Sequence, residues 1–397
     1  MSKVETKETA GAQTLKKPQL NMKQYGMVIM LIVVYVFFAI LTGGKNMTPM
    51  NINNLIMQNG YVVILAVGML LCVLTGNVDL GVGSVVAACG AVAGTLLMDF
   101  GVSAPVAMLG ALAVGAAFGV FVGFFVSKLE IPPFIVTLAT MLMGRGLCYV
   151  ILKAQTKGPL PAAYNWIGTG FLPTIKIGSG VDLICLIVAA VACVLLVLGE
   201  LKTRKNAQKH NLPVDPMVLT VVKLAVLLTV VIFFFYKLAC YNGIPVVLIL
   251  MALIVAIYHF ITTKTVAGRQ VYAMGGNAKA ARLSGINTKK VFFWVYANMG
   301  LLAAVAGIVL TARNQSATPK AGDGFEMDAI ASCYIGGAAT SGGVGTIIGA
   351  VVGAFIMGIL NNGMSLAGYD TNVQKIVKGC VLLGAVTFDL VSKRKKK

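Results

Sequence analysis

Residues 275–286 read GGNAKAARLSGI and lie between two long apolar runs, at 244–262 and 291–312. Asn277 is a favourable N-cap residue, Gly285 is favourable just after the C-terminus of a helix, and the alanines between them are strong helix formers. Two helical turns are too short to be stable alone in water, so tertiary packing must hold them. The stretch therefore predicts a short polar helix in a loop that connects two membrane-length segments.

The composition is that of a polytopic membrane protein. Of the 397 residues, 58% are hydrophobic and 11% are charged, against roughly 25% charged residues in soluble domains. A membrane-spanning helix needs about 20 mostly apolar residues. We expect an all-α fold with candidate segments at 26–42, 54–75, 82–98, 104–127, 131–152, 181–199, 217–236, 244–262, 291–312, 327–340, 344–360 and 374–391.

Two of these runs, 82–98 and 327–340, are short and rich in glycine. Such interrupted pieces indicate broken or re-entrant helices beside a transport pathway. We predict 12 membrane segments, or 10 full crossings if both short runs are re-entrant. Similar glycine-rich turns at 81–84 and 343–346 form a weak internal repeat, which fits either ordinary helix packing or a duplicated transporter unit.

The net charge of +19 comes mostly from basic residues that lie outside the apolar runs. Basic loops stay on the cytosolic side of a membrane, and this distribution argues against a nucleic-acid interface. The segment 154–180 would then be extracytoplasmic. The predicted organisation is a cytosolic N-terminal tail at 1–24, a transmembrane permease domain at 25–391 with a cytosolic connector at 200–216 and a cytosolic coupling loop at 263–290, and a basic cytosolic tail at 392–397.

Motifs for catalysis, metal binding and nucleotide binding are missing from the sequence. The eight cysteines form no C-x-x-C pair, there are only two histidines, and no P-loop is present. We therefore expect no catalytic residues, no metal site and no cofactor, with any ATP bound by a separate subunit.

Polar residues inside the apolar runs are candidates for a solute pathway, because such residues are costly in a membrane. Arg145 can instead pair with a backbone carbonyl or an acid, and Asp79 can cap a helix. Buried amides also tie helices together, so packing competes with transport for each of them. The candidate pathway residues are Asn59, Asn77, Asp79, Thr137, Arg145, Asn298, Asn361 and Asn362.

Several stretches of the sequence resemble the permease subunits of bacterial monosaccharide ABC importers, the ribose, galactose and xylose class. The matching motifs include 275–287, with GGN and ARLSGIN, EMDAIA at 326–331, SGGVGT at 341–346, GNVDLGVGS at 76–84 and PPFIVTL at 132–138. The resemblance covers most of residues 50–390. Three apolar runs lie between 153 and the GGN loop, where most of the family has about one, and this is similar to the xylose and multiple-monosaccharide branch.

The resemblance implies a permease homodimer in the bacterial cytoplasmic membrane, with both termini in the cytosol, surrounded by membrane lipid. It also implies a separate ABC ATPase subunit and an extracytoplasmic sugar-binding protein. The short polar helix becomes the helix that couples the permease to the ATPase, with Ala281 facing a groove in that subunit. The residues expected in this coupling role are Gly275, Gly276, Asn277, Ala280, Ala281, Arg282 and Gly285.

The function expected from the sequence is import of a monosaccharide, xylose or a related sugar, by a non-enzymatic permease subunit. One alternative is a permease for branched-chain amino acids or nucleosides in the same type of importer. A second is an ion-coupled secondary transporter, which would need a cation site near the middle of the membrane.

Overall fold

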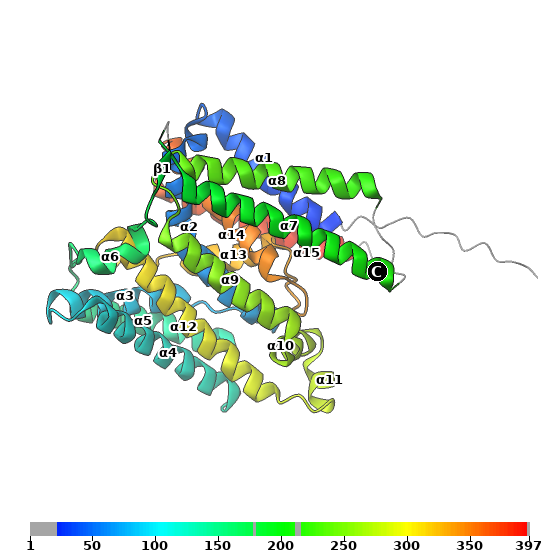
Figure 1. Ribbon diagram of the computed structural model, residues 1–397. Coiled ribbons are helices and arrows are strands. Elements are labelled where there is room, and N and C mark those ends of the chain that lie inside the picture. The colour runs from blue at the N-terminus through cyan, green and yellow to red at the C-terminus, as the bar shows by residue number, and fades with distance from the viewer. Residues whose placement is uncertain (1–21, 178–179, 211–215, 395–397) are drawn as a thin grey trace, which may run out of the picture.

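The computed structural model describes residues 22–177, 180–210 and 216–394, and these form an almost entirely helical bundle (Figure 1). Eight of the described helices are long and apolar enough to cross a membrane. The elements are α1 (Met22–Leu41), η1 (Lys45–Met47), α2 (Pro49–Leu74), α3 (Val82–Met98), α4 (Ala104–Ser127), α5 (Pro133–Leu152), α6 (Ala162–Thr169), β1 (Lys176–Ile177), β2 (Val181–Asp182), α7 (Leu183–Lys209), α8 (Met217–Ala239), α9 (Val246–Lys264), α10 (Val266–Gly276), α11 (Ala278–Leu283), α12 (Thr288–Asn314), α13 (Phe325–Ile335), α14 (Ile347–Leu366) and α15 (Thr371–Arg394).

Helices α2 and α12 form the centre of the bundle. The most apolar window of α2 is 83% buried and that of α12 is 72% buried, whereas the corresponding values are 11% for α7 and 0% for α8. Helix α12 packs against α2, α3 and α4, and α14 packs against α1, α2 and α13. Helices α7 and α8 leave most of their apolar surface open, and such a surface can face lipid, so they form an outer layer of the bundle.

The two ends of the bundle are distinct in Figure 1. Helices α10 and α11 lie at one end, at the lower right of the view, whereas α6 and β1 lie at the other end. We call the first the coupling end. At the opposite end, isolated bridges join Lys157 to Ala317 and Phe171 to Pro245, and β1 pairs with β2 in antiparallel register.

Helices α3 and α13 are short segments that each complete a crossing with a neighbouring non-helical stretch. Leu74 lies at the coupling end, where its carbonyl accepts a hydrogen bond from the Gly343 N–H (2.9 Å), and Asp99 lies at the opposite end beside Lys157. The chain crosses again between Ala317 and Gly343. The 11-residue α13 is only about 16 Å long, roughly half of a bilayer core of about 30 Å. Both short runs therefore cross the bundle, and neither is re-entrant.

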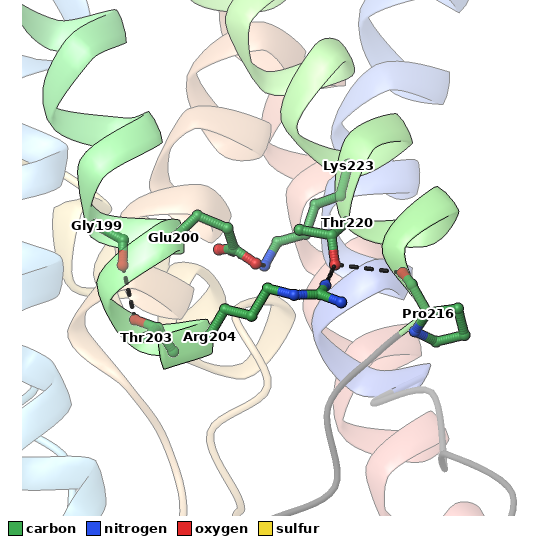
Figure 2. A network of polar contacts seen from close by, with 7 residues as sticks. All are labelled: Gly199, Glu200, Thr203, Arg204, Pro216, Thr220 and Lys223. Carbon is green, nitrogen blue, oxygen red and sulfur yellow. Dashed lines mark hydrogen bonds and ion pairs between the residues drawn. The ribbon is translucent and has the colours of Figure 1, made fainter. Parts of the chain in front are cut away.

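Helix α7 continues to Lys209, ten residues beyond the predicted end of its apolar run at 199. Polar contacts with α8 hold this extension (Figure 2). Lys223 Nζ lies 3.1 Å from Glu200 Oε2, and Arg204 Nη1 donates to Thr220 Oγ1 at 2.9 Å. The predicted connector at 200–216 is thus largely helical among its described residues. In the predicted loop 154–180, the structure also places α6 and strand β1, which the sequence did not suggest.

Candidate functional site

The short polar helix forms as predicted. Asn277 Oδ1 accepts a hydrogen bond from the Ala280 N–H at 3.0 Å, which caps the start of α11. At the other end, Gly285 has a φ of 86°, and the Ile286 N–H donates to the Ala281 carbonyl at 3.0 Å. This is a Schellman ending, so both predicted caps are confirmed.

The side chains of α11 divide into a buried and an exposed set. Ala281 is only 5% exposed, so its methyl group packs inside the chain itself. The prediction that Ala281 faces outward, toward a groove in the ATPase, is therefore wrong. Leu283, by contrast, is 90% exposed. Together with the exposed Lys279, Ala280 and Arg282 it makes an outward surface, which we call the α11 surface.

The coupling loop is fixed tightly to the transmembrane bundle. A Cβ atom added at Gly275 would collide with the Leu74 carbonyl oxygen and would lie 2.5 Å from the Gly343 nitrogen, so only glycine permits this approach. The Tyr272 hydroxyl donates to the Gly345 carbonyl at 2.7 Å. A displacement of α10 and α11 would therefore be transmitted directly to the end of α2 and the start of α14. The remaining predicted coupling residue, Gly276, is exposed.

The membrane-depth amides serve mainly as contacts between helices. Asn59 Nδ2 donates to the Ala354 carbonyl at 3.0 Å, and the side chains of Asn51 and Asn362 exchange hydrogen bonds of 2.9 and 3.1 Å. These contacts tie α2 to α14. Asn298 accepts from the Tyr258 hydroxyl and joins α12 to α9, and Asn361 is 9% exposed. These four predicted pathway residues do not converge on one space.

A second group of predicted residues surrounds the start of α3. Asp79 Oδ1 accepts from the Gly81 N–H at 2.8 Å and so caps the turn that leads into the helix, which is the structural alternative considered for this residue. Thr137 is fully buried against Gly81, and Asn77 donates to the Thr75 carbonyl at 3.1 Å. A small cavity next to them is lined by the polar side chains of Asp79 and Thr140 and otherwise by apolar or glycine residues of α3, α4 and α12.

Arg145 pairs with backbone carbonyls, as the structural alternative anticipated. Its Nη1 donates to the carbonyls of Pro319 and Ala321 at 2.8 and 2.6 Å. These carbonyls belong to the run of turns at 319–324 before α13, where no helix or sheet satisfies them. Arg145 therefore holds the unwound part of a broken helix against α5, which is a common way to stabilise irregular backbone at membrane depth.

Two neighbouring ion pairs join the start of α13 to α15, and none of their residues was predicted as part of a site. Lys375 Nζ lies 2.8 Å from Asp323 Oδ2, and Lys378 Nζ lies 2.9 Å from Asp328 Oδ1. The acids stand at the start of α13 and the lysines on α15. Two lysines three residues apart in an apolar run share one helix face, and that spacing was the available sequence signal. We call Asp323, Glu326, Asp328, Lys375 and Lys378 the α13–α15 charged face.

Comparison with known proteins agrees with this membrane architecture. A family model described as a branched-chain amino acid transport system permease component matches residues 51–204 and 213–386. The xylose transport system permease protein of Haemophilus influenzae is 37% identical over 96% of this chain and 99% of its own length. The xylose permease of Escherichia coli K12 is 37% identical over 95% of this chain and 94% of its own length, and the ribose import permease of the same strain is 33% identical over 97% and 98%.

No solved structure matches the chain. The resemblance to permeases of monosaccharide importers, seen in the motifs at 275–287 and 341–346, is confirmed by relatives that align over nearly the full length. The chain therefore belongs to the family of branched-chain amino acid transport system permease components, as a multi-pass membrane protein whose relatives include xylose and ribose permeases.

Proposed function

We propose that this chain is the membrane-spanning subunit of an ATP-driven importer that carries a monosaccharide, xylose or a related sugar, into the cytoplasm. The observation that carries the proposal is its alignment, over nearly its whole length, with xylose and ribose permeases. The chain itself performs no chemistry on the sugar and holds no cofactor in this proposal. ATP is bound by a separate subunit.

The α11 surface is the proposed contact with that ATPase. Leu283 is almost fully exposed on a rigidly capped helix, and basic side chains surround it. The close packing of Gly275 against Leu74 and Gly343 supports a mechanical role, because motion of α11 would reach α2, α14 and the turn before α3. Alternating access would follow from rocking of these helices.

The distribution of basic residues supports a cytosolic position for the coupling end, both termini and the α7–α8 connection. The end that carries α6 and the β1–β2 hairpin would then face outward, where an extracytoplasmic sugar-binding protein delivers the sugar. A bacterial cytoplasmic membrane fits this arrangement. The permease works as a homodimer in this proposal.

The test is uptake in proteoliposomes that contain the permease together with its ATPase subunit and its sugar-binding protein. We expect ATP-dependent accumulation of radiolabelled xylose or ribose, and no accumulation with an ATPase variant that cannot hydrolyse ATP. Uptake of leucine but of neither sugar would favour the branched-chain amino acid alternative that the family description raises. Uptake driven by a proton or sodium gradient without ATP would favour the ion-coupled alternative.

A further inference from the structure

The extension of α7 beyond its apolar run carries a row of lysines on one face. The exposed side chains of Leu195 and Leu198 are three residues apart, so they share one face of the helix. Intervals of three and four residues continue from them through the exposed Lys202, Lys205 and Lys209. The same helix face is therefore apolar up to residue 198 and basic from residue 202 onward. We call the three lysines the α7 lysine stripe.

The stripe lies outside the contact between α7 and α8. Glu200 and Arg204 lie in that contact, where they meet Lys223 and Thr220 of α8 (Figure 2). Glu200 is the only acid in the sequence of α7, and its carboxylate is paired with Lys223. Among the described residues, none forms an ion pair with a lysine of the stripe. The contact with α8 thus fixes the direction of the stripe and leaves its three positive charges without a counter-charge from the protein.

The stripe begins where the membrane surface is expected. The stretch 183–202 of α7 has a length of about 30 Å, which equals the thickness of a bilayer core. Helix α8 indicates the same level independently. Arg204 lies opposite Thr220, and the exposed Val218 and Val221 beside Thr220 are still apolar. The first two lysines of the stripe are therefore at the level where hydrocarbon gives way to lipid headgroups.

The neighbour of this face at that level is lipid. The most apolar windows of α7 and α8 are only 11% and 0% buried, so the apolar part of the face lies against acyl chains. The headgroups of those lipids then lie beside the stripe. A lysine near the end of a membrane helix extends its ammonium group to the headgroups, and clusters of basic residues just beyond a membrane helix attract anionic lipids.

We propose that Lys202, Lys205 and Lys209 form a binding surface for the phosphate groups of anionic phospholipids. The acyl chains of a bound lipid lie along Leu195 and Leu198, on the same helix face. Because α7 starts directly after the β1–β2 hairpin, its extension points toward the coupling end, and the lipid belongs to the leaflet at that end (Figure 1).

Bound lipid would stabilise a weakly supported part of the molecule. Helix α7 packs chiefly on α8, and α8 contacts the rest of the bundle mainly through α2 and β2. Attachment of the stripe to headgroups would hold this helix pair at a fixed depth in the membrane.

The experiment measures which lipid lies beside α7 in the full-length permease in nanodiscs. Cys193, Cys240 and Cys380 are replaced by serine, since the other five cysteines are buried, and a fluorophore is attached to Leu198→Cys, one turn before the stripe. The nanodiscs consist of phosphatidylcholine with a small fraction of nitroxide-labelled phosphatidylglycerol or nitroxide-labelled phosphatidylcholine. Each nitroxide lipid quenches the fluorophore when it lies next to α7, so the two quenching constants give the local preference for the anionic lipid.

The variants separate the charge of the stripe from charge elsewhere. Lys202→Gln with Lys205→Gln removes two charges of the stripe, whereas Lys202→Arg with Lys205→Arg keeps them. The matched control is Lys153→Gln with Lys176→Gln, which removes two exposed lysines at the opposite end of the bundle.

We expect phosphatidylglycerol to be preferred over phosphatidylcholine by at least about fivefold at position 198, which is the effect of a single basic residue near a charged membrane surface. The arginine variant and the control should keep this preference, and the glutamine variant of the stripe should lower it to less than about twofold. Equal quenching by the two lipids with the native stripe would overturn the inference and would favour an acidic protein surface as the partner of the lysines. A preference that survives the glutamine variant also overturns it, because the anionic lipid would then be recognised elsewhere. The assay needs no transported solute, so its outcome is independent of the proposed function.

Discussion

Helices α7 and α15 are both long and both exposed along much of their length, yet their open surfaces differ in chemistry. Between residues 183 and 198 of α7 the exposed side chains are apolar, among them Val191, Val194 and Leu195 at 52%, 56% and 63%. Helix α15 also exposes apolar side chains, such as Ile376 and Leu383 at 68% and 69%, but it exposes Lys375 as well, paired with Asp323. Exposure in a single membrane chain therefore has two meanings. An apolar open surface can rest against lipid, whereas a charged one at membrane depth requires water or another protein surface.

The largest expected effect is at the buried half of the α13–α15 charged face. Lys378→Met would leave the Asp328 carboxylate, 2% exposed, without its cation. Removing one partner of a buried ion pair typically costs about 3–5 kcal/mol, so we expect little folded protein in the membrane, measured by fluorescence-detected size exclusion. The double variant Asp328→Asn with Lys378→Met removes both charges and should recover most of the abundance. Normal abundance of the single variant would show that this pair does not stabilise the fold.

A second large effect is expected at Leu283, an exposed apolar residue outside the bilayer. Lipid does not reach a residue outside the bilayer, so we expect a protein partner to cover this exposed side chain. Leu283→Ser should reduce co-purification of the ATPase and ATP-dependent uptake by roughly 10-fold or more, as for an interface residue worth about 2 kcal/mol. Membrane abundance should be unchanged. The control is Lys279→Ala on the same helix, whose long charged side chain should matter less. Equal effects of the two variants would contradict a specific role for Leu283.

Ala281→Glu sharpens this distinction between the two sides of α11. Because Ala281 is 5% exposed inside the chain, a buried carboxylate should destabilise the coupling loop itself. We expect faster proteolysis within 263–290, even in the absence of the ATPase. A variant with wild-type protease resistance that loses only the ATPase would restore the original prediction of an outward-facing Ala281.

Much of this arrangement was predictable from local sequence. The ends of α3 and α4 agree with the predicted runs 82–98 and 104–127, and the caps of α11 follow from Asn277 and Gly285. These features depend on neighbouring residues. The burial of Ala281 and the pairing of Asp323 with Lys375, 52 residues apart, depend on tertiary packing, which local patterns do not contain. For the same reason the buried amides could not be separated from pathway residues in advance.

A smaller effect is expected on the lipid-facing side of the comparison. Leu195→Ala should change uptake by less than about twofold, because an apolar side chain lies against lipid both before and after the substitution. Lys375→Ala, at nearly the same exposed fraction, should lower uptake severalfold with membrane abundance retained. Uptake assays on the two variants, normalised to abundance, compare the surfaces directly. A larger loss of uptake for Leu195→Ala than for Lys375→Ala would contradict the assignment of the α7 surface to lipid.

The smallest effect concerns the Glu130–Lys289 pair near α11, which lies at the surface with 2.6 Å between its charged atoms. The hydrogen bond and charge of Lys289 hold the pKa of Glu130 below its usual value. A lowered carboxyl pKa gives stability that is present above the unfolded-state pKa and lost as the pH falls through the folded-state pKa. Because both side chains are solvent-exposed, Glu130→Gln should leave the melting temperature at neutral pH almost unchanged. A clear drop in the melting temperature at neutral pH that disappears at acidic pH would show that this ion pair stabilises the fold more than expected.

Two native cysteines that are not buried, one on each of the compared helices, allow the most direct test of the proposed homodimer, whose interface we expect at α15 while α7 faces lipid. Cys380 lies exposed on α15 and Cys193 lies on α7. Variants that keep only one of the two, with Cys240 also replaced, are treated with a short bifunctional maleimide in native membranes. The predicted result is a cross-linked dimer through Cys380 and none through Cys193. Cross-linking through Cys193 with none through Cys380 would contradict the account.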